Sequence, residues 1–236
     1  MDELIKLVEN LEKENDEKKQ ITLLQQIESK LLNEYNIVIE DTVIEPLRLE
    51  AYYYPFENKG KFDDPCAHKC TKKINNFGKL YFIEERYGYP GIDICLSLGN
   101  YYLSFLIKNS RIKDTYYKQM DLFDRFQDKR NEIEIMDVLE KVKNKEKIVF
   151  KTSRVGLKKS QTKFAHKLLA SVVELKNSSG YDFERGYGKE WMVANYMFEN
   201  NIPETDENIK TLLGYKSQNV KNLIKEMTKC SIFHLN

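Results

Sequence analysis

Glu50 and Tyr52 are the residues whose types and spacing most directly suggest chemistry. They lie two positions apart in the segment LEAYYYP. The alternation of this segment predicts a β-strand, so both side chains point to one face. A carboxylate can take a proton from water and stabilise a developing positive charge, and a tyrosine ring can stack on a planar group. The pair therefore indicates an activated water beside a stacked ring.

Two further segments carry residues that could bind a planar group or form hydrogen bonds to it. DDPCAH ends at His68, and GKLYFIEERYGYPG contains Tyr81 and Tyr87. Each has a purely structural alternative: Glu50 as an ordinary outward charge, His68 as a solvated loop residue, and the tyrosines as packing residues. Only the three segments taken together favour a functional site.

In this order the three segments resemble the alkyladenine (methylpurine, 3-methyladenine) DNA glycosylase family. That family has a Glu-Ala-Tyr, an Asp-containing loop ending in Ala-His, and a Gly-x-Leu-Tyr-x-Tyr strand that runs into a Tyr-Gly turn. Downstream, YYLSFLIKNSRI is similar to the family's apolar strand with a basic residue after it, which is Lys108 here. TSRVGLKKSQTKFAHKLLASVV is similar to its late strands and aligns Arg154. The resemblance covers about residues 22–176 and describes a divergent member.

The resemblance implies a monofunctional DNA N-glycosylase. Such an enzyme flips a damaged or modified base out of double-stranded DNA and hydrolyses its N-glycosidic bond, leaving an abasic site. Glu50 would be the catalytic residue that activates water. No metal and no cofactor are expected, because nothing in the sequence indicates a Schiff-base lysine or a metal requirement.

The resemblance also assigns the remaining site residues. Tyr52 would stack on the flipped base from one side and Tyr81 or Phe82 from the other, with His68 near the base or its 5′ phosphate. Tyr87 would fill the gap left in the duplex. The resemblance also implies Lys108 and Arg154 close to the DNA backbone, and a local cluster of basic residues adds Lys158 and Lys159 as expected DNA contacts.

The sequence departs from the family pattern around the base pocket. The segment from Tyr81 to Tyr87 is one residue longer than usual, and IDICLS replaces the usual Cys-x-Asn context, which leaves Asp93 as the nearest polar candidate. An aspartate only accepts hydrogen bonds and carries charge. Asp93 therefore predicts a base that is cationic or bears an amino group.

The elements that must position these residues form an α+β pattern. Apolar residues at helical spacing predict two N-terminal helices, and period-two stretches over 35–55, 78–82, 91–98 and 101–109 predict a curved, mostly antiparallel sheet. Residues 115–147 are expected to form one or two surface helices, and strands are expected to return within 148–157 and 167–175.

Two domains are predicted. Residues 1–176 would form the glycosylase-like domain, with an acidic N-terminal helix over 1–20, and residues 181–236 a small helical module. In this module three helical patterns have the spacing of a helix-turn-helix. The short polar stretch after residue 176 predicts a linker.

Charge and composition narrow the function classes. The 236 residues hold 38 Lys and Arg against 37 Asp and Glu, yet the balance runs from −7 over 1–50 to +5 over 151–236. The basic tail is compatible with a polyanion partner. Apolar runs are too short for a membrane helix, and the N-terminus lacks the pattern of a signal peptide. We expect a monomeric cytoplasmic protein without membrane contact, associated with the nucleoid if it is bacterial.

Three alternatives stay open at the level of sequence. The protein could be a non-catalytic DNA- or RNA-binding protein that uses the helical module, or an interaction protein that binds through its acidic first helix. The spacing of Cys66, His68 and Cys70 also suggests zinc ligands, but it lacks a second paired cluster. Retention of Glu50 within its motif favours the enzyme.

Overall fold

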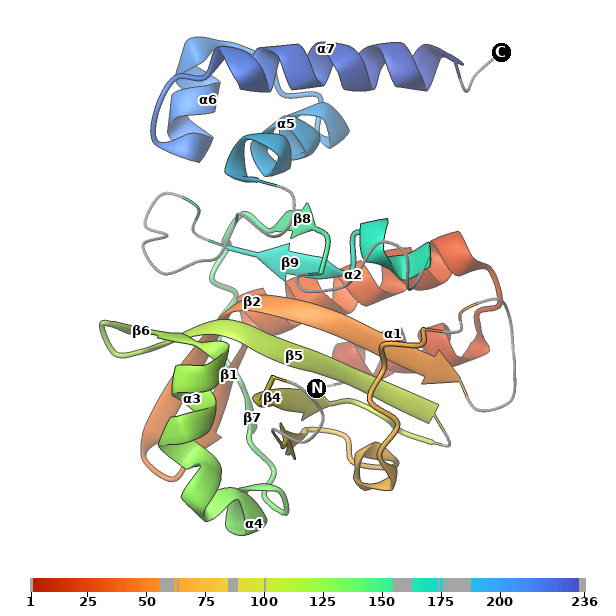
Figure 1. Cartoon of the computed structure of the whole chain (residues 1–236), viewed down its shortest axis with the longest axis vertical. Helices are drawn as coiled ribbons and strands as arrows, with labels where there is room; N and C mark the ends of the chain where they lie inside the picture. The colour runs from red at the N-terminus through yellow and green to blue at the C-terminus, as the bar shows by residue number, and fades with distance from the viewer. Residues whose placement is uncertain are drawn as a thin grey trace.

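The structure is a computed structural model that describes residues 2–55, 62, 64–84, 89–99, 101–154, 163–173, 175 and 188–233. Within them the chain forms a curled antiparallel sheet with flanking helices (Figure 1). The predicted α+β class is confirmed.

The sheet is built around a long central hairpin. Its strand order is β3-β4-β5-β2-β1-β7; in addition β6 pairs with β5, β9 pairs with β2, and β8 pairs with β9. All its pairs are antiparallel. The strands are β1 (Tyr35–Ile39), β2 (Thr42–Pro55), β3 (Lys79–Ile83), β4 (Gly91–Cys95), β5 (Tyr101–Ile112), β6 (Thr115–Lys118), β7 (Leu139–Lys141), β8 (Phe150–Thr152) and β9 (Ala170–Val172).

Strand β2 bends where it changes partners. It pairs with β1 over its first residues and with β9 around Glu50, while β5 follows it on the other edge. The register shifts on both sides of Arg48, next to Pro46, which has no amide hydrogen for the ladder. This irregularity curls the sheet, because a bulge increases the local twist.

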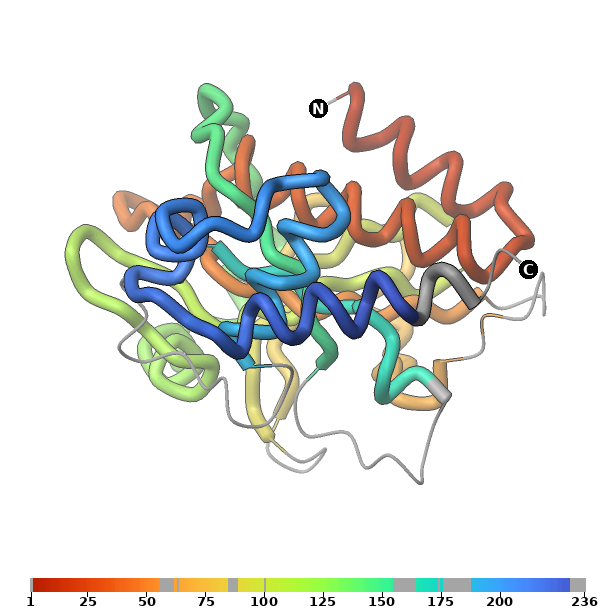
Figure 2. The backbone as a smooth tube through the Cα atoms, turned by 90° about the horizontal axis from the view of Figure 1, so that it is seen from above, coloured from red at the N-terminus to blue at the C-terminus, as the bar shows by residue number. Residues whose placement is uncertain are grey.

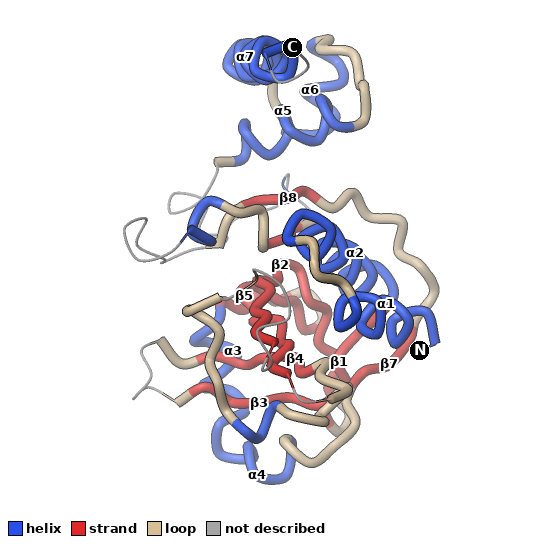
Figure 3. Tube along the Cα trace, turned by 90° about the vertical axis from the view of Figure 1, so that its right-hand side faces the viewer, coloured by secondary structure: helices blue, strands red, loops and turns tan. Residues whose placement is uncertain are grey.

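One face of the sheet is covered by the N-terminal helices α1 (Asp2–Lys13) and α2 (Glu17–Glu34) (Figure 3). Leu4, Val8 and Leu11 are buried at helical spacing, as predicted. Asp16 caps α2 by accepting a hydrogen bond from the Lys19 amide at 2.9 Å. The main core lies between these helices and the apolar face of the sheet.

The expectation for residues 115–147 is only partly right. Helices α3 (Gln119–Phe126) and α4 (Arg130–Ile133) are present, but β6 precedes them and β7 follows them. Strand β6 turns back on β5 at Lys113, whose φ is 53°. The other difference is length, since the strands expected over 148–157 and 167–175 are three residues each.

The C-terminal module contains α5 (Lys189–Glu199), α6 (Asp206–Leu213) and α7 (Gln218–Phe233), close to the predicted segments. Seen from above, these helices lie over the sheet domain (Figure 2). Their core also includes Phe150, Val172 and Leu175 from the sheet domain. The predicted linker lies outside the described residues, and the two predicted domains share this second core.

Candidate active site

Glu50 lies in the middle of β2, flanked on both sides by other strands. Its register partners are Leu106 on β5 and Ala170 on β9, and its side chain is fully buried. The Tyr52 hydroxyl donates a hydrogen bond of 3.1 Å to Oε2 of Glu50. Nη2 of Arg48 lies 3.9 Å from Oε1. The structure thus brings Glu50 and Tyr52 together as the alternation predicts.

Tyr52 is held as a neutral hydrogen-bond donor. Burial, together with the negative charge of Glu50, raises the pKa of the Tyr52 phenol well above its ordinary value. Its ring is partly exposed, whereas Glu50 is not. The tyrosine therefore belongs to the outer layer of the site, and the carboxylate lies behind it.

Arg154 takes a different position from the one expected. Its guanidinium lies 4.5 Å from the centroid of the Tyr52 ring and is 2% exposed. It forms two bonds to Asp64, of 2.5 and 3.1 Å, and donates to the carbonyl of Ala51 at 3.1 Å. In this structure the Arg154 side chain is buried and joins Asp64 to the sheet, so its contact with a DNA backbone stays a prediction that this position does not favour. Asp64 itself was missed, although the DDP sequence before Cys66 carries the signal.

A row of side chains crosses the sheet from Glu50. Leu106 pairs with both Glu50 and Asp93, and Asp93 pairs with Tyr81. Directly paired residues point to the same face of a sheet. With about 4.8 Å between strands, the backbones of Glu50 and Asp93 are separated by about 10 Å. We define the candidate active site as Glu50, Tyr52, His68, Lys73, Tyr81 and Asp93.

Lys73 is the residue of this site that the sequence analysis missed. It is 1% exposed and forms a buried ion pair with Oδ2 of Asp93. Ser104 joins the pair, because its hydroxyl donates to the same oxygen at 2.9 Å and accepts from Lys73 at 3.2 Å. Asp93 is therefore not an uncompensated charge, and the sequence-based argument for a cationic base loses its physical basis. Oδ1 of Asp93 is buried without a hydrogen-bond partner among the described residues.

His68 and Tyr81 close the site above Lys73. Nε2 of His68 lies 3.3 Å from the Tyr81 hydroxyl, and Nζ of Lys73 lies 5.0 Å from the centroid of the Tyr81 ring. Burial and the positive charge of Lys73 lower the pKa of His68, although Asp93 opposes this. The imidazole is consequently neutral at pH 7, and it is partly exposed. The structure places His68 and Tyr81 in contact, and their contact with a base stays a prediction.

Two other predicted residues are not part of this cluster. Phe82 points to the opposite face of β3, packs in the main core and lies 5.9 Å from the ring of Phe123. Neighbouring strand residues face opposite ways, so Phe82 does not share the face of Tyr81, and its stacking on a base stays a prediction that this packing does not favour. Lys108 donates to Gln119 on α3 at 2.6 Å, and Gln119 donates to the carbonyl of Pro90 at 2.7 Å. Lys108 thus supports the turn before β4.

That turn carries an exposed aromatic residue that the sequence analysis did not single out. Tyr89 is 74% exposed and directly precedes the buried Pro90. Three predicted DNA-binding residues, Tyr87, Lys158 and Lys159, lie outside the described residues. Tyr89 is therefore a second aromatic candidate for contact with a nucleic acid at this turn.

A buried carboxyl group lies on the other face of the sheet. Glu28 of α2 is fully buried and accepts a hydrogen bond from Ser171 on β9 at 2.6 Å. Burial, reinforced by the negative charge of Glu50, raises the pKa of Glu28 to about 8. Glu28 is therefore largely protonated at neutral pH, and it adds little negative charge behind Glu50.

The start of the third C-terminal helix is engaged within the module. Ser217 and Asn219 both donate to the carboxylate of Glu190 on α5, and Lys221 pairs with Asp206 at 2.7 Å. Ser217 and Asn219, at the start of α7, therefore serve the packing of the three helices in this structure.

No family model and no curated protein matches this chain. Within the described residues, no helix is long and apolar enough to cross a membrane, and no group of three or more histidines, cysteines and carboxylates could hold a metal ion. Cys66 and Cys70 are free thiols there.

Proposed function

We propose that this protein is a monofunctional DNA glycosylase that uses Glu50 to activate water. The observation that carries the proposal is the position of Glu50. Its carboxylate is fully buried, accepts a hydrogen bond from Tyr52, and shares one sheet face with Asp93 and Tyr81. A preorganised carboxylate next to aromatic rings suits the cleavage of a bond between a planar base and a sugar.

The reaction needs one carboxylate and one water. As the bond between the sugar C1′ and the base nitrogen breaks, positive charge develops on the sugar and Glu50 stabilises it. Glu50 then takes a proton from the water whose oxygen bonds to C1′. The base leaves with the bonding electrons and takes up a proton from solvent, while Glu50 releases to solvent the proton that it accepted from water. The products are a free base and an abasic site, and the carboxylate is regenerated.

The aromatic residues would hold the flipped base. Tyr52 and Tyr81 lie on the same face as Glu50, and each stacked ring contributes about 1–3 kcal/mol to binding of a base. Tyr52 and His68 are partly exposed, so an incoming base would meet them before it reaches Asp93. The water would replace one of the present partners of Glu50.

The ion pair between Lys73 and Asp93 supports a neutral base as the preferred substrate. Because Lys73 compensates the charge of Asp93, a cationic base gains little attraction here, and Lys73 repels it. Oδ1 of Asp93 remains able to accept a hydrogen bond from a base N–H group. We expect hypoxanthine to be preferred over 3-methyladenine or 7-methylguanine.

The test is alkali-revealed strand cleavage of labelled duplexes. The panel carries 3-methyladenine, 7-methylguanine, hypoxanthine, ethenoadenine and modified cytosines. Wild type is compared with Glu50→Gln and with Glu140→Gln, a matched change at an exposed glutamate on β7. We expect wild type and Glu140→Gln to release one of these bases, and Glu50→Gln to bind the same duplex with at least 100-fold slower release.

The same experiment decides against the main alternative. A wild-type protein that binds duplexes in a salt-dependent way and releases no base from any of them would favour the non-catalytic nucleic-acid-binding protein. Equal release by wild type and Glu50→Gln would contradict the role of Glu50.

A further inference from the structure

A second concave region lies at the start of β2, away from the candidate active site. Its cavity has a volume of about 760 Å³ and is formed by the β1–β2 turn, the β5–β6 hairpin, α3 and the segment after β7. Glu45, on its wall, precedes Glu50 by five residues, which corresponds to about 16 Å along a strand. The cavity is therefore separate from the site described above.

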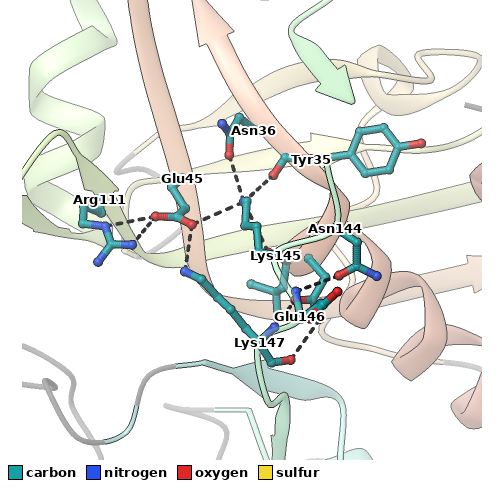
Figure 4. A network of polar contacts seen from close by, with 10 residues as sticks. Tyr35, Asn36, Glu45, Arg111, Asn144, Lys145, Glu146 and Lys147 are labelled. Atoms are coloured by element: carbon teal, nitrogen blue, oxygen red, sulfur yellow. Dashed lines mark hydrogen bonds and ion pairs between the residues drawn. The ribbon is translucent and has the colours of Figure 1, made fainter. Parts of the chain in front are cut away.

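The centre of this region is a carboxylate shared by three cations (Figure 4). Arg111 pairs with Oε2 of Glu45 and donates to it through Nε at 3.0 Å, while Nζ of Lys147 and Nζ of Lys145 lie 2.8 and 3.4 Å from Oε1. These cations lower the pKa of Glu45 to about 2, against the opposing effect of burial. Glu45 is therefore ionised at all physiological pH values and holds the three cations in place.

The carboxylate of Glu45 does not neutralise all the cations of this cavity. Four cationic side chains line the cavity against two carboxylates, which leaves an excess of two positive charges. The cations are Arg111, Lys113, Arg125 and Lys145, and the carboxylates are Asp41 and Glu45.

Lys145 is the cation of this region on which the repulsion by its neighbours is evident. Its amino group also donates to the carbonyl of Tyr35 at 3.1 Å and to Oδ1 of Asn36 at 2.9 Å. Burial, with the repulsion of Lys147 and Arg111, nevertheless lowers the pKa of Lys145. A bound anion would relieve this repulsion.

We infer that this cavity binds a phosphate ester of nucleotide size. Arginine and lysine together suit phosphate oxygens, because the guanidinium offers paired donors and the ammonium a compact charge. The volume falls in the range of small-molecule sites, about 300–1,000 Å³. Tyr117 lines the same cavity, accepts a hydrogen bond of 3.2 Å from Arg125 and has the same guanidinium 5.5 Å from its ring centroid. A nucleobase would stack on this ring beside the cations.

The test measures binding of three probes by calorimetry: inorganic phosphate, adenosine monophosphate and a short single-stranded oligonucleotide. Lys113→Gln/Arg125→Gln removes two exposed cations of the lining, where neither change disturbs the buried core. Lys141→Gln/Lys143→Gln is the matched control, because it removes the same charge from exposed positions outside the lining. Thermal melting verifies that both variants are folded.

We expect the mononucleotide to bind at least tenfold more tightly than inorganic phosphate. The lining variant should weaken it at least tenfold and the control less than twofold. If the oligonucleotide displaces the mononucleotide, the natural ligand is the phosphate of a nucleic-acid backbone. If the oligonucleotide does not displace it, the natural ligand is a free nucleotide. The inference is overturned if none of the probes binds saturably, or if the control variant weakens binding as much as the lining variant.

Discussion

At the scale of single residues, the candidate active site depends on how buried charges are paired. Asp93 and Lys73 are each 1% exposed, and an isolated charge at such a depth is strongly unfavourable. Removal of either side chain therefore leaves the other as an unpaired charge in the protein interior. This makes Lys73 a residue that sets both the stability and the charge of the site.

Lys73→Met is expected to destabilise the protein by about 3–5 kcal/mol, because it leaves Asp93 buried without its partner. Urea unfolding measures the loss. The double variant Lys73→Met/Asp93→Asn is the control, and it should recover a large part of the stability because the unpaired charge is gone. A double variant no more stable than the single one would show that the charge of Asp93 is not the cause.

Glu28 predicts a pH dependence of folding. Its pKa in the folded protein is raised from 4.5 to about 8, so the folded state favours the protonated form. The resulting stability is complete below pH 4.5 and is lost as the pH rises toward 8, with an amplitude on the order of a few kcal/mol. We expect the urea midpoint of Glu28→Gln to change less between pH 5.5 and pH 8.5 than the midpoint of wild type. Identical pH dependence in the two proteins would contradict the burial of an ionisable Glu28.

At the scale of elements, strand β4 and helix α3 must approach closely for the site to form. A Cβ atom at Gly91 would lie 2.7 Å from Nε2 of Gln119 and 2.8 Å from a methyl carbon of Leu106. The same Gln119 holds Lys108 and the carbonyl of Pro90. Glycine at position 91 therefore allows the turn, the strand and the helix to meet.

Gly91→Ala is expected to cost about 1–3 kcal/mol, because side chains of the packed interface must shift. Gly188→Ala is the matched control, since nothing lies within 4 Å of a Cβ atom there, and it should change stability by less than about 0.5 kcal/mol. Chemical denaturation of both variants measures the difference. Equal losses of stability in the two variants would mean that α3 shifts to accommodate the added methyl group without a cost in free energy.

At the scale of the whole molecule, the helical module and the sheet share a core. Phe150 on β8 and Val172 on β9 pack with Val193 and Met197 on α5, and the rings of Phe150 and Tyr196 are 5.3 Å apart. Apolar side chains that serve two units couple the unfolding of one to the unfolding of the other. We therefore expect the module to unfold together with the sheet.

This coupling predicts coincident thermal transitions. Trp191 is the single tryptophan of the chain and lies on α5, so its fluorescence reports on the module, while far-ultraviolet circular dichroism reports on the whole chain. We expect the two melting curves to have the same midpoint. Met197→Ala should lower both midpoints together, at a cost of about 2–5 kcal/mol. Separate transitions would show that the module folds independently.

The sequence by itself determined the local elements and the alternation of β2. Apolar spacing is a local property of the chain, so it correctly predicted the N-terminal helices, the central strands and the three C-terminal helices. For the same reason it placed Glu50 and Tyr52 on one face. It failed at β6 and β7, where pairing with β5 and β1 overrides the helical character of the surrounding segment.

Only the tertiary structure decided which charges are buried together. Lys73 is 20 residues from Asp93, and Arg154 is 90 residues from Asp64, so no local pattern reports either pair. Whether a lysine or an arginine faces DNA or another side chain depends on what the folded sheet places next to it. For that reason the sequence predicts Arg154 as a DNA contact, whereas the folded structure buries its side chain beside Tyr52.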